Sequence, residues 1–179
     1  MKVVIVGGVA GGASAAARIR RLDEHAQIIM IERSGYVSYA NCGLPYYVGG
    51  VIKGQAELTL QTPESFWDRF RIDARVRQEV TAINPAEKNV TVRALDSGKS
   101  YTETYDKLIL APGAKPTVPA LSGVSSERVF TLRTVEDEHT IRYKKNLPIN
   151  TEVETELKEC ADSSREWDSK MEHLLHILT

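Results

Sequence analysis

The stretch from Lys2 to Glu32 constrains the fold of this chain more than any other. Lys2 to Val6 is a β-branched run without polar alternation, as expected of a parallel strand buried on both faces. Gly7-Gly8-Val9-Ala10-Gly11-Gly12 follows directly, and the alanine-rich segment 13–22 predicts a helix. A second buried strand is expected at 27–31, ending at Glu32.

This order of strand, glycine turn, helix, strand and acid is the context of a dinucleotide-binding fingerprint. Glycines permit the tight turn, and the helix N-terminus can then receive a pyrophosphate. Glu32 stands about 20 residues beyond the turn, where a carboxylate bonds a ribose hydroxyl. Aligned as G-x-G-x-x-G, Gly7 and Gly12 fit, but Val9 occupies the middle glycine position. A glycine-rich turn without a ligand is the alternative.

A cysteine stands in a second distinctive stretch, Ser38-Tyr39-Ala40-Asn41-Cys42-Gly43-Leu44-Pro45-Tyr46-Tyr47. Cys42 follows a loop and precedes a predicted short helix. Backbone N–H groups and the helix dipole there favour the thiolate, which is the form that attacks disulfides. We therefore expect a redox thiol beside a redox cofactor. The alternative is that Cys42 is a small buried hydrophobe.

The middle of the chain predicts one helix and three antiparallel strands. Thr62 is a suitable N-cap for a helix beginning at Pro63, whose residues Phe66, Trp67 and Phe70 we expect to pack in the core. Segments 80–83, 90–94 and 101–105 then alternate or are β-branched, with turn residues between them. They predict a three-stranded β-meander laid across a parallel sheet.

Segment 105–111 predicts a return to a buried strand, and the turn 112–116 follows it. Gly113 would let the backbone approach a cofactor closely, although an ordinary loop explains it equally. A last short strand is expected at 130–133, followed by a helix from Val135 to Arg142 that Thr134 caps.

The carboxyl-terminal part differs in character, so we divide the chain into a domain (1–142), a linker (143–150) and an amphipathic helical tail (151–179). Thr151 and Glu154 form a capping box. A heptad seam follows: Val153, Leu157, Cys160, Ser164, Trp167, Met171, Leu174 and Leu178. We expect the tail to dock on its own domain or on a second copy; peptide recognition or a coiled coil is the alternative.

The composition excludes several classes of partner. The net charge of −1 gives no reason to expect a nucleic acid or a membrane surface, and no apolar run is long enough to span a membrane. No metal site is expected. The two cysteines, Cys42 and Cys160, lie far apart, which indicates a reducing compartment and hence a cytoplasmic location.

Together these stretches resemble the N-terminal, FAD-binding part of the single-cysteine pyridine nucleotide-disulfide oxidoreductases. Within that family the chain is most similar to the coenzyme A disulfide reductases and the related NADH oxidases and persulfide reductases. The resemblance covers residues 1 to about 142. It rests on the segments 7–16, 19–23, 38–46, 105–114 and 130–133.

The resemblance implies a set of site residues. Those expected to bind FAD are Gly7, Gly8, Val9, Ala10, Gly11, Gly12, Glu32, Arg33, Asn41, Cys42, Val80, Ala111, Pro112 and Gly113. Those expected to bind a coenzyme A substrate are Arg18, Arg21, Ser38 and Asn41. Cys42 would be the catalytic thiol, which forms a mixed disulfide with coenzyme A and is regenerated by reduced flavin. From the residues alone, a solvated helix face is the preferred interpretation of Arg18 and Arg21.

Members of the family continue into an NAD(P)H-binding domain, the rest of the FAD domain and a dimerisation domain, none of which is recognisable here. We therefore expect a chain that is truncated relative to the family. Three functions remain open: an FAD-dependent oxidoreductase, a non-catalytic FAD-binding fragment, and an interaction module with a vestigial pocket and a dimerising tail. The acceptor could be a disulfide, a persulfide or oxygen, and the donor NADH or NADPH.

Overall fold

The computed structural model describes residues 1–127 and 129–145, and residues 1–141 of these belong to one compact unit. The expected tail (151–179) and most of the expected linker (143–150) lie outside the described residues. The final helix, α4 (Val135–Lys145), continues into the first residues of that linker.

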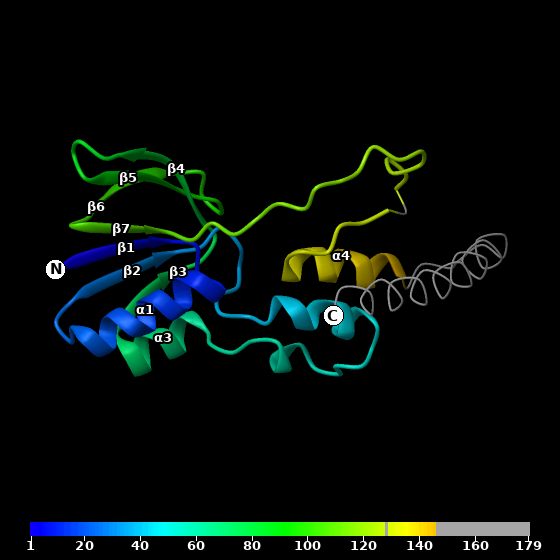
Figure 1. The fold of residues 1–179 in the computed structure, drawn as a ribbon, viewed down its shortest axis with the longest axis horizontal. Coiled ribbons are helices and arrows are strands. Elements are labelled where there is room, and N and C mark those ends of the chain that lie inside the picture. The colour runs from blue at the N-terminus through cyan, green and yellow to red at the C-terminus, as the bar shows by residue number, and fades with distance from the viewer. Residues whose placement is uncertain (128, 146–179) are drawn as a thin grey trace, which may run out of the picture. The chain divides into compact units, whose positions relative to one another are not determined.

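A four-stranded parallel sheet forms the centre of this unit, in the order β3-β2-β1-β7 (Figure 1). Its strands are β1 (Lys2–Val6), β2 (Gln27–Ile31), β3 (Ile72–Arg75) and β7 (Lys107–Leu110). The helices are α1 (Ala10–Leu22), α2 (Leu44–Val48), α3 (Pro63–Phe70) and α4, with 3-10 turns η1 (Asn41–Gly43) and η2 (Gln55–Glu57). The predicted strands at 2–6 and 27–31 are confirmed. The first helix begins at Ala10, three residues earlier than predicted.

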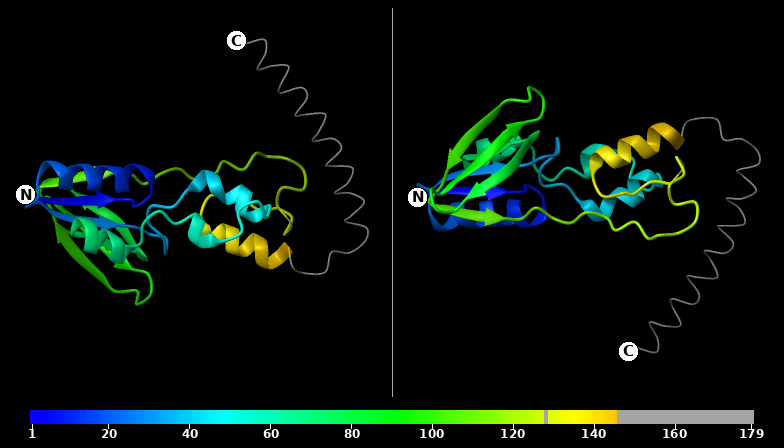
Figure 2. Two further views of the ribbon diagram at one scale, coloured as in Figure 1. Left: turned by 90° about the horizontal axis from the view of Figure 1, so that it is seen from below. Right: turned by 90° about the horizontal axis from the view of Figure 1, so that it is seen from above.

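Successive residues of β1 face opposite sides of the sheet, as the pleat requires. Val3 and Ile5 pack in one buried cluster with residues of α1 and α3, including Phe66. Val4 packs on the other side with Val90 and Val92. The two views in Figure 2 show α1 and α3 on one face and the second sheet on the other. Because both faces of β1 are covered, every residue from Val3 to Ile5 is buried, which explains why the strand is continuously β-branched without polar alternation.

The second sheet is the predicted antiparallel meander, with strands β4 (Gln78–Asn84), β5 (Asn89–Ala94) and β6 (Ser100–Thr104). Its register shifts between Val80 and Ala82, where the pairing of β4 with β5 is irregular. The parallel sheet plus meander confirms the fold class expected from the sequence.

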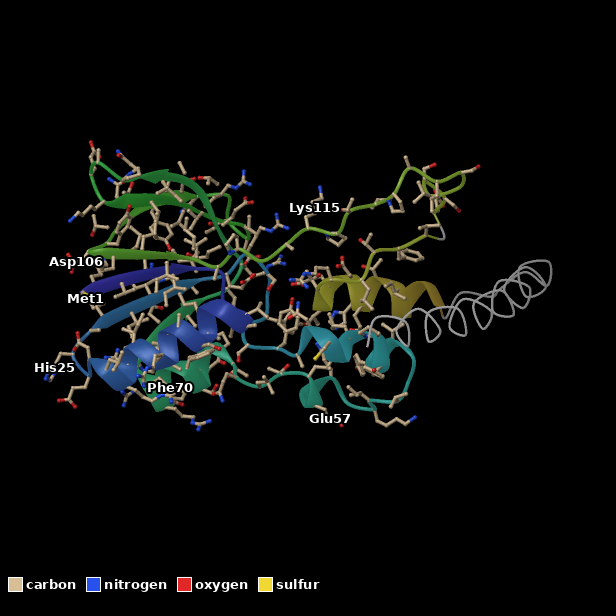
Figure 3. All side chains as sticks on the ribbon, in the orientation of Figure 1. Met1, His25, Glu57, Phe70, Asp106 and Lys115 are labelled. Carbon is tan, nitrogen blue, oxygen red and sulfur yellow. The ribbon has the colours of Figure 1, made fainter. Side chains whose placement is uncertain are left out.

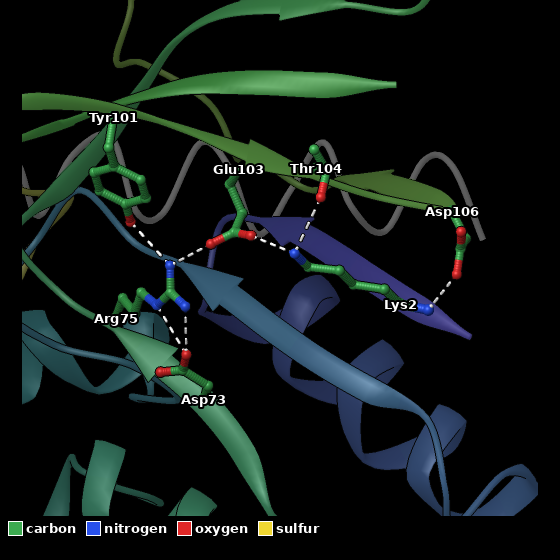
Figure 4. A network of polar contacts seen from close by, with 7 residues as sticks. All are labelled: Lys2, Asp73, Arg75, Tyr101, Glu103, Thr104 and Asp106. Carbon is green, nitrogen blue, oxygen red and sulfur yellow. Dashed lines mark hydrogen bonds and ion pairs between the residues drawn. The ribbon is translucent and has the colours of Figure 1, made fainter. Parts of the chain in front are cut away.

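A polar network joins the outer strand of the meander to the parallel sheet (Figure 4). Glu103 of β6 accepts hydrogen bonds from Lys2 of β1 at 2.5 Å and from Arg75 of β3 at 2.7 Å. The Arg75 guanidinium also bonds Asp73 and the hydroxyl of Tyr101. One carboxylate thus links strands from both sheets.

Four details differ from the sequence predictions. β3 was not predicted, and residues 130–133 are not a strand. β7 lies at the edge of the sheet in the described part of the chain, so it is only partly buried and Leu110 is 57% exposed. In α3, Phe66 is buried as expected, but Trp67 faces solvent with the Arg71 guanidinium 5.6 Å from its ring.

The Thr62 cap is confirmed: its side chain accepts a hydrogen bond from the N–H of Ser65.

Candidate functional site

The glycine turn between β1 and α1 is closed so tightly that side chains cannot enter it. Gly7 has a φ of 98°, and a Cβ at this residue would lie 2.0 Å from the carbonyl oxygen of Ala111. A Cβ at Gly12 would lie 1.8 Å from the carbonyl oxygen of Gly7. Both positions therefore require glycine. The turn brings the first residues of α1 against the end of β7.

Glu32 fixes the turn from the end of β2. Its Oε2 accepts a hydrogen bond of 2.7 Å from the N–H of Gly8, and its Oε1 accepts one of 2.8 Å from the N–H of Ser34. Each carboxylate oxygen can accept more than one hydrogen bond. Glu32 is therefore held in place by the backbone and can still accept a hydrogen bond from a ligand.

The cysteine segment is bound to the same turn. Ser38, in the left-handed region with a φ of 47°, donates its N–H to the carbonyl of Gly8 at 2.8 Å. Backbone bonds from Ala40 to Leu58 and from Leu60 to Ser38, both 2.9 Å, close the base of the loop. The position of the cysteine segment is thus set by the glycine turn.

Cys42 lies in η1, directly before α2, and its side chain is exposed. The alternative that it is a small buried hydrophobe is wrong. The next residue, Gly43, is buried. Leu58 packs so closely against it that a Cβ at Gly43 would lie 2.5 Å from Leu58 Cδ2. This close packing holds the backbone of η1 while leaving the thiol accessible.

A long groove of about 1650 Å³ connects these features. It is larger than the roughly 300–1,000 Å³ typical of sites for drug-sized ligands. Most of the residues that the sequence indicated line it: Gly7, Val9, Ala10, Gly11, Arg21, Glu32, Arg33, Ser38, Asn41, Cys42, Val80, Ala111, Pro112 and Gly113. Gly8 and Gly12 shape the turn without lining the groove, and Arg18 is exposed elsewhere on α1.

Sequence reasoning missed Arg133, which also lines the groove. Its guanidinium would lie 3.6 Å from a Cβ at Gly113, and its carbonyl accepts a hydrogen bond of 3.4 Å from the Asn41 side chain. Lys115, on the segment after β7, is a second missed cation in the groove lining (Figure 3). The sequence feature that could have pointed to Arg133 as a site residue is its position directly before Thr134, the N-cap of the next helix.

These residues fit a dinucleotide. The first turn of α1 contains no acidic side chain, so its free backbone N–H groups present a positive dipole end to an anion. Arg133 adds a full positive charge to the same groove, and Glu32 supplies an acceptor for a sugar hydroxyl. The glycines allow a pyrophosphate to approach the backbone closely.

Arg21 of α1 lines the groove together with two aromatic residues of α3, Phe66 and Phe70. Figure 3 labels Phe70 at the end of α3. Phe66 is buried in the core, so the groove combines the Arg21 cation and the partly buried Phe70 ring with the exposed thiol of Cys42.

No helix among residues 1–127 and 129–145 is long and apolar enough to cross a membrane. In the same residues, no group of three or more His, Cys, Asp and Glu side chains is placed to hold a metal ion.

Comparison with known proteins shows that the chain is similar to a family of oxidoreductases. The family model for pyridine nucleotide-disulphide oxidoreductases matches residues 1–155. The coenzyme A disulfide reductase of Staphylococcus aureus (strain JH9) is 44% identical over 140 residues, which are 78% of this chain and 31% of that protein. The chain thus spans about a third of the length of this curated relative.

Solved structures show the same likeness. The reduced CoADR-RHD protein of Bacillus anthracis superposes with a TM-score of 0.76 and 52% identity, over 79% of this chain and 26% of that one. An NAD-dependent persulfide reductase from A. fulgidus superposes with a TM-score of 0.73 and 36% identity, over 79% and 27% of the two chains.

Proposed function

The chain belongs to the pyridine nucleotide-disulphide oxidoreductase family, and from this premise we propose that residues 1–142 bind FAD and present Cys42 as a redox thiol to a coenzyme A-type disulfide. FAD would extend along the groove, with its pyrophosphate at the glycine turn and a ribose hydroxyl on Glu32. Arg133, which sequence reasoning missed, would neutralise part of the pyrophosphate charge.

One observation supports this proposal most directly: the exposed thiol and the glycine turn line one groove, and the Ser38–Gly8 hydrogen bond connects the segments that carry them. A thiol that exchanges electrons with a bound cofactor must be both accessible and fixed relative to it. Cys42 meets the first requirement by its exposure and the second through the bonds that hold residues 38–43.

The chemistry assigned to this chain is one thiol–disulfide exchange. The Cys42 thiolate attacks one sulfur of the substrate disulfide, a Cys42–S–S–coenzyme A bond forms, and the second coenzyme A leaves as a thiolate. Two-electron reduction of this mixed disulfide breaks its S–S bond, returns Cys42 to the thiolate and releases the coenzyme A that it held; FAD reduced by NAD(P)H would supply those two electrons. Asn41 and Ser38, which flank the thiol in the groove, would orient the incoming sulfur.

The substrate class is proposed from the name of the Staphylococcus aureus relative, and the lining of the groove is compatible with it. Coenzyme A combines phosphates with a long pantetheine arm. Arg21 offers a charge for the phosphates, and the partly buried ring of Phe70 offers an apolar wall for the arm. Arg18, which is exposed on the same helix, would contact only the outermost phosphate.

Mass spectrometry after incubation with coenzyme A disulfide tests this function. We expect one coenzyme A adduct per chain on Cys42, with one equivalent of free coenzyme A released. Cys160→Ser should behave like the parent protein and Cys42→Ser should form no adduct at this position. An adduct on Cys160 alone, or none on a folded protein, would refute the role of Cys42.

The second candidate is a non-catalytic FAD-binding fragment. It is favoured by the match to about 31% of the length of the Staphylococcus aureus relative. NAD(P)H-dependent reduction of coenzyme A disulfide by the FAD-loaded chain separates the two. Turnover supports the oxidoreductase, whereas flavin binding and adduct formation without turnover support the fragment.

A further inference from the structure

Tyr39 combines a buried ring with a hydroxyl that has no hydrogen-bond partner in the described part of the chain. The residue is 6% exposed, and its ring packs with Leu44, Leu58 and Val135. It also lines the groove. The hydroxyl oxygen itself is not enclosed by protein atoms, so a ligand in the groove can reach it. A hydroxyl beside a ligand groove that has no partner inside the protein is free to donate a hydrogen bond to the ligand.

The surroundings keep this hydroxyl protonated. Burial, followed by the negative charges of Glu32 and Glu136, raises the pKa of Tyr39 to about 12, against a smaller opposing effect of Arg133. Tyr39 is thus a neutral hydrogen-bond donor at every pH at which the protein would work.

A second polar atom beside the groove also lacks a partner. Glu136 Oε1 accepts the N–H of Gly35 at 2.9 Å, but its Oε2 is buried and has no hydrogen-bond partner among residues 1–127 and 129–145. A phosphate near Glu136 and Glu32 would be repelled by like charge. A sugar hydroxyl would not be, since it can accept a hydrogen bond from Tyr39 and turn its own proton toward a carboxylate.

We propose that the Tyr39 hydroxyl donates a hydrogen bond to a sugar hydroxyl of the bound dinucleotide and is a binding residue of the groove. This inference rests on the proposed function, because it requires FAD in the groove. The hydroxyl belongs either to the ribose of the adenosine half or to the ribityl chain of the flavin half.

Tyr39→Phe tests the proposal, since it keeps the packed ring and removes only the hydroxyl. Tyr36→Phe is the matched control: Tyr36 packs against the same cluster but does not line the groove. We expect Tyr39→Phe to weaken FAD binding about three- to tenfold, which is the loss of one hydrogen bond. Its thermal midpoint without ligand should equal or exceed that of the parent, because no internal bond is lost. Tyr36→Phe should leave FAD affinity unchanged.

Titrations with FMN and competition with ADP identify the ligand hydroxyl. Weaker ADP binding by Tyr39→Phe places it on the adenosine ribose, and weaker FMN binding with unchanged ADP binding places it on the ribityl chain. Equal FAD affinity of parent and Tyr39→Phe overturns this inference alone. A lowered thermal midpoint of the unliganded variant overturns it too, because the hydroxyl would then have a partner inside the protein. A parent protein that fails to bind FAD overturns both this inference and the proposed function.

Discussion

The backbone N–H of Ser38 donates a hydrogen bond of 2.8 Å to the carbonyl oxygen of Gly8. Gly8 also donates its own N–H to Glu32 at 2.7 Å. One glycine therefore connects the end of β2, the turn before α1 and the segment that carries Cys42. Because both bonds share Gly8, a small shift at this residue should move the thiol and the cofactor turn together.

We predict that Gly8→Ala weakens FAD binding and lowers stability. Its Cβ would lie 2.8 Å from Val37 Cγ1 and 3.1 Å from Glu32 Cβ, and Val37 is buried and cannot move aside freely. Overpacking of this kind costs about 1–3 kcal/mol. Thermal melts and FAD titrations measure both effects. Gly35→Ala is the control, since nothing lies nearer than 3.6 Å to its Cβ; equal melting of the two variants would contradict the prediction.

Glu32→Gln should weaken FAD binding by about tenfold or more. One carboxylate oxygen becomes an NH₂ group facing the N–H of either Gly8 or Ser34, so a charge-assisted bond worth about 1.5–3 kcal/mol is lost. Isothermal titration measures the affinity. Glu24→Gln, at an exposed surface position, should have no effect. Parent-like affinity of Glu32→Gln would show that this carboxylate neither holds the turn nor binds the ligand.

The network around Glu103 should make stability depend on acid pH. Burial by itself raises the pKa of Glu103, but hydrogen bonds from Lys2 and Arg75 outweigh it and hold the pKa below its ordinary value of 4.5. A lowered pKa means that ionised Glu103 stabilises the fold fully above pH 4.5 and loses this effect as the pH falls through the lowered value.

Glu103→Gln should therefore melt below the parent at pH 7, and the difference should shrink as the pH falls below 4.5. Differential scanning calorimetry across this range measures it. A difference that stays constant between pH 7 and pH 3 would show that ionisation of Glu103 does not contribute.

The different burial of the central strand β1 and the edge strand β7 predicts a contrast in stability. Ile5 is fully buried in the centre of the sheet, so Ile5→Ala should cost about 2–5 kcal/mol in the free energy of unfolding. Leu110 at the edge is mostly exposed, so Leu110→Ala should change that free energy by less than about 0.5 kcal/mol. Urea unfolding measures both. A comparable cost at Leu110 would mean that β7 is covered in solution.

The sequence predicted the elements whose signals are local. β1 and β2 were recognised because burial on both faces demands continuous apolar residues, and the family resemblance followed from the glycine and cysteine segments and is confirmed by the comparisons. β3 was missed because Asp73 and Arg75 interrupt its apolar character. Its place in the sheet depends on pairing Ile72 with Ile28, a contact between distant residues.

Other features could not be predicted for the same reason. Residues 130–133 have a strand-like composition but pair with no strand in the part of the chain that the structure describes. Arg133 and Tyr39 became candidates only through the fold, which brings Arg133 to Gly113 and leaves the Tyr39 hydroxyl at the groove wall. The heptad tail at 151–179 stays a prediction, since it lies outside the described residues.

The central claim is that this chain binds FAD in the groove. Titration of the purified protein with FAD, monitored through the quenching of flavin fluorescence, tests it most directly. We expect saturable binding of one FAD per chain, because the glycine turn, the first turn of α1 and Glu32 all line or shape one groove. A protein that circular dichroism shows to be folded, yet that neither carries flavin nor quenches added FAD, would contradict the account.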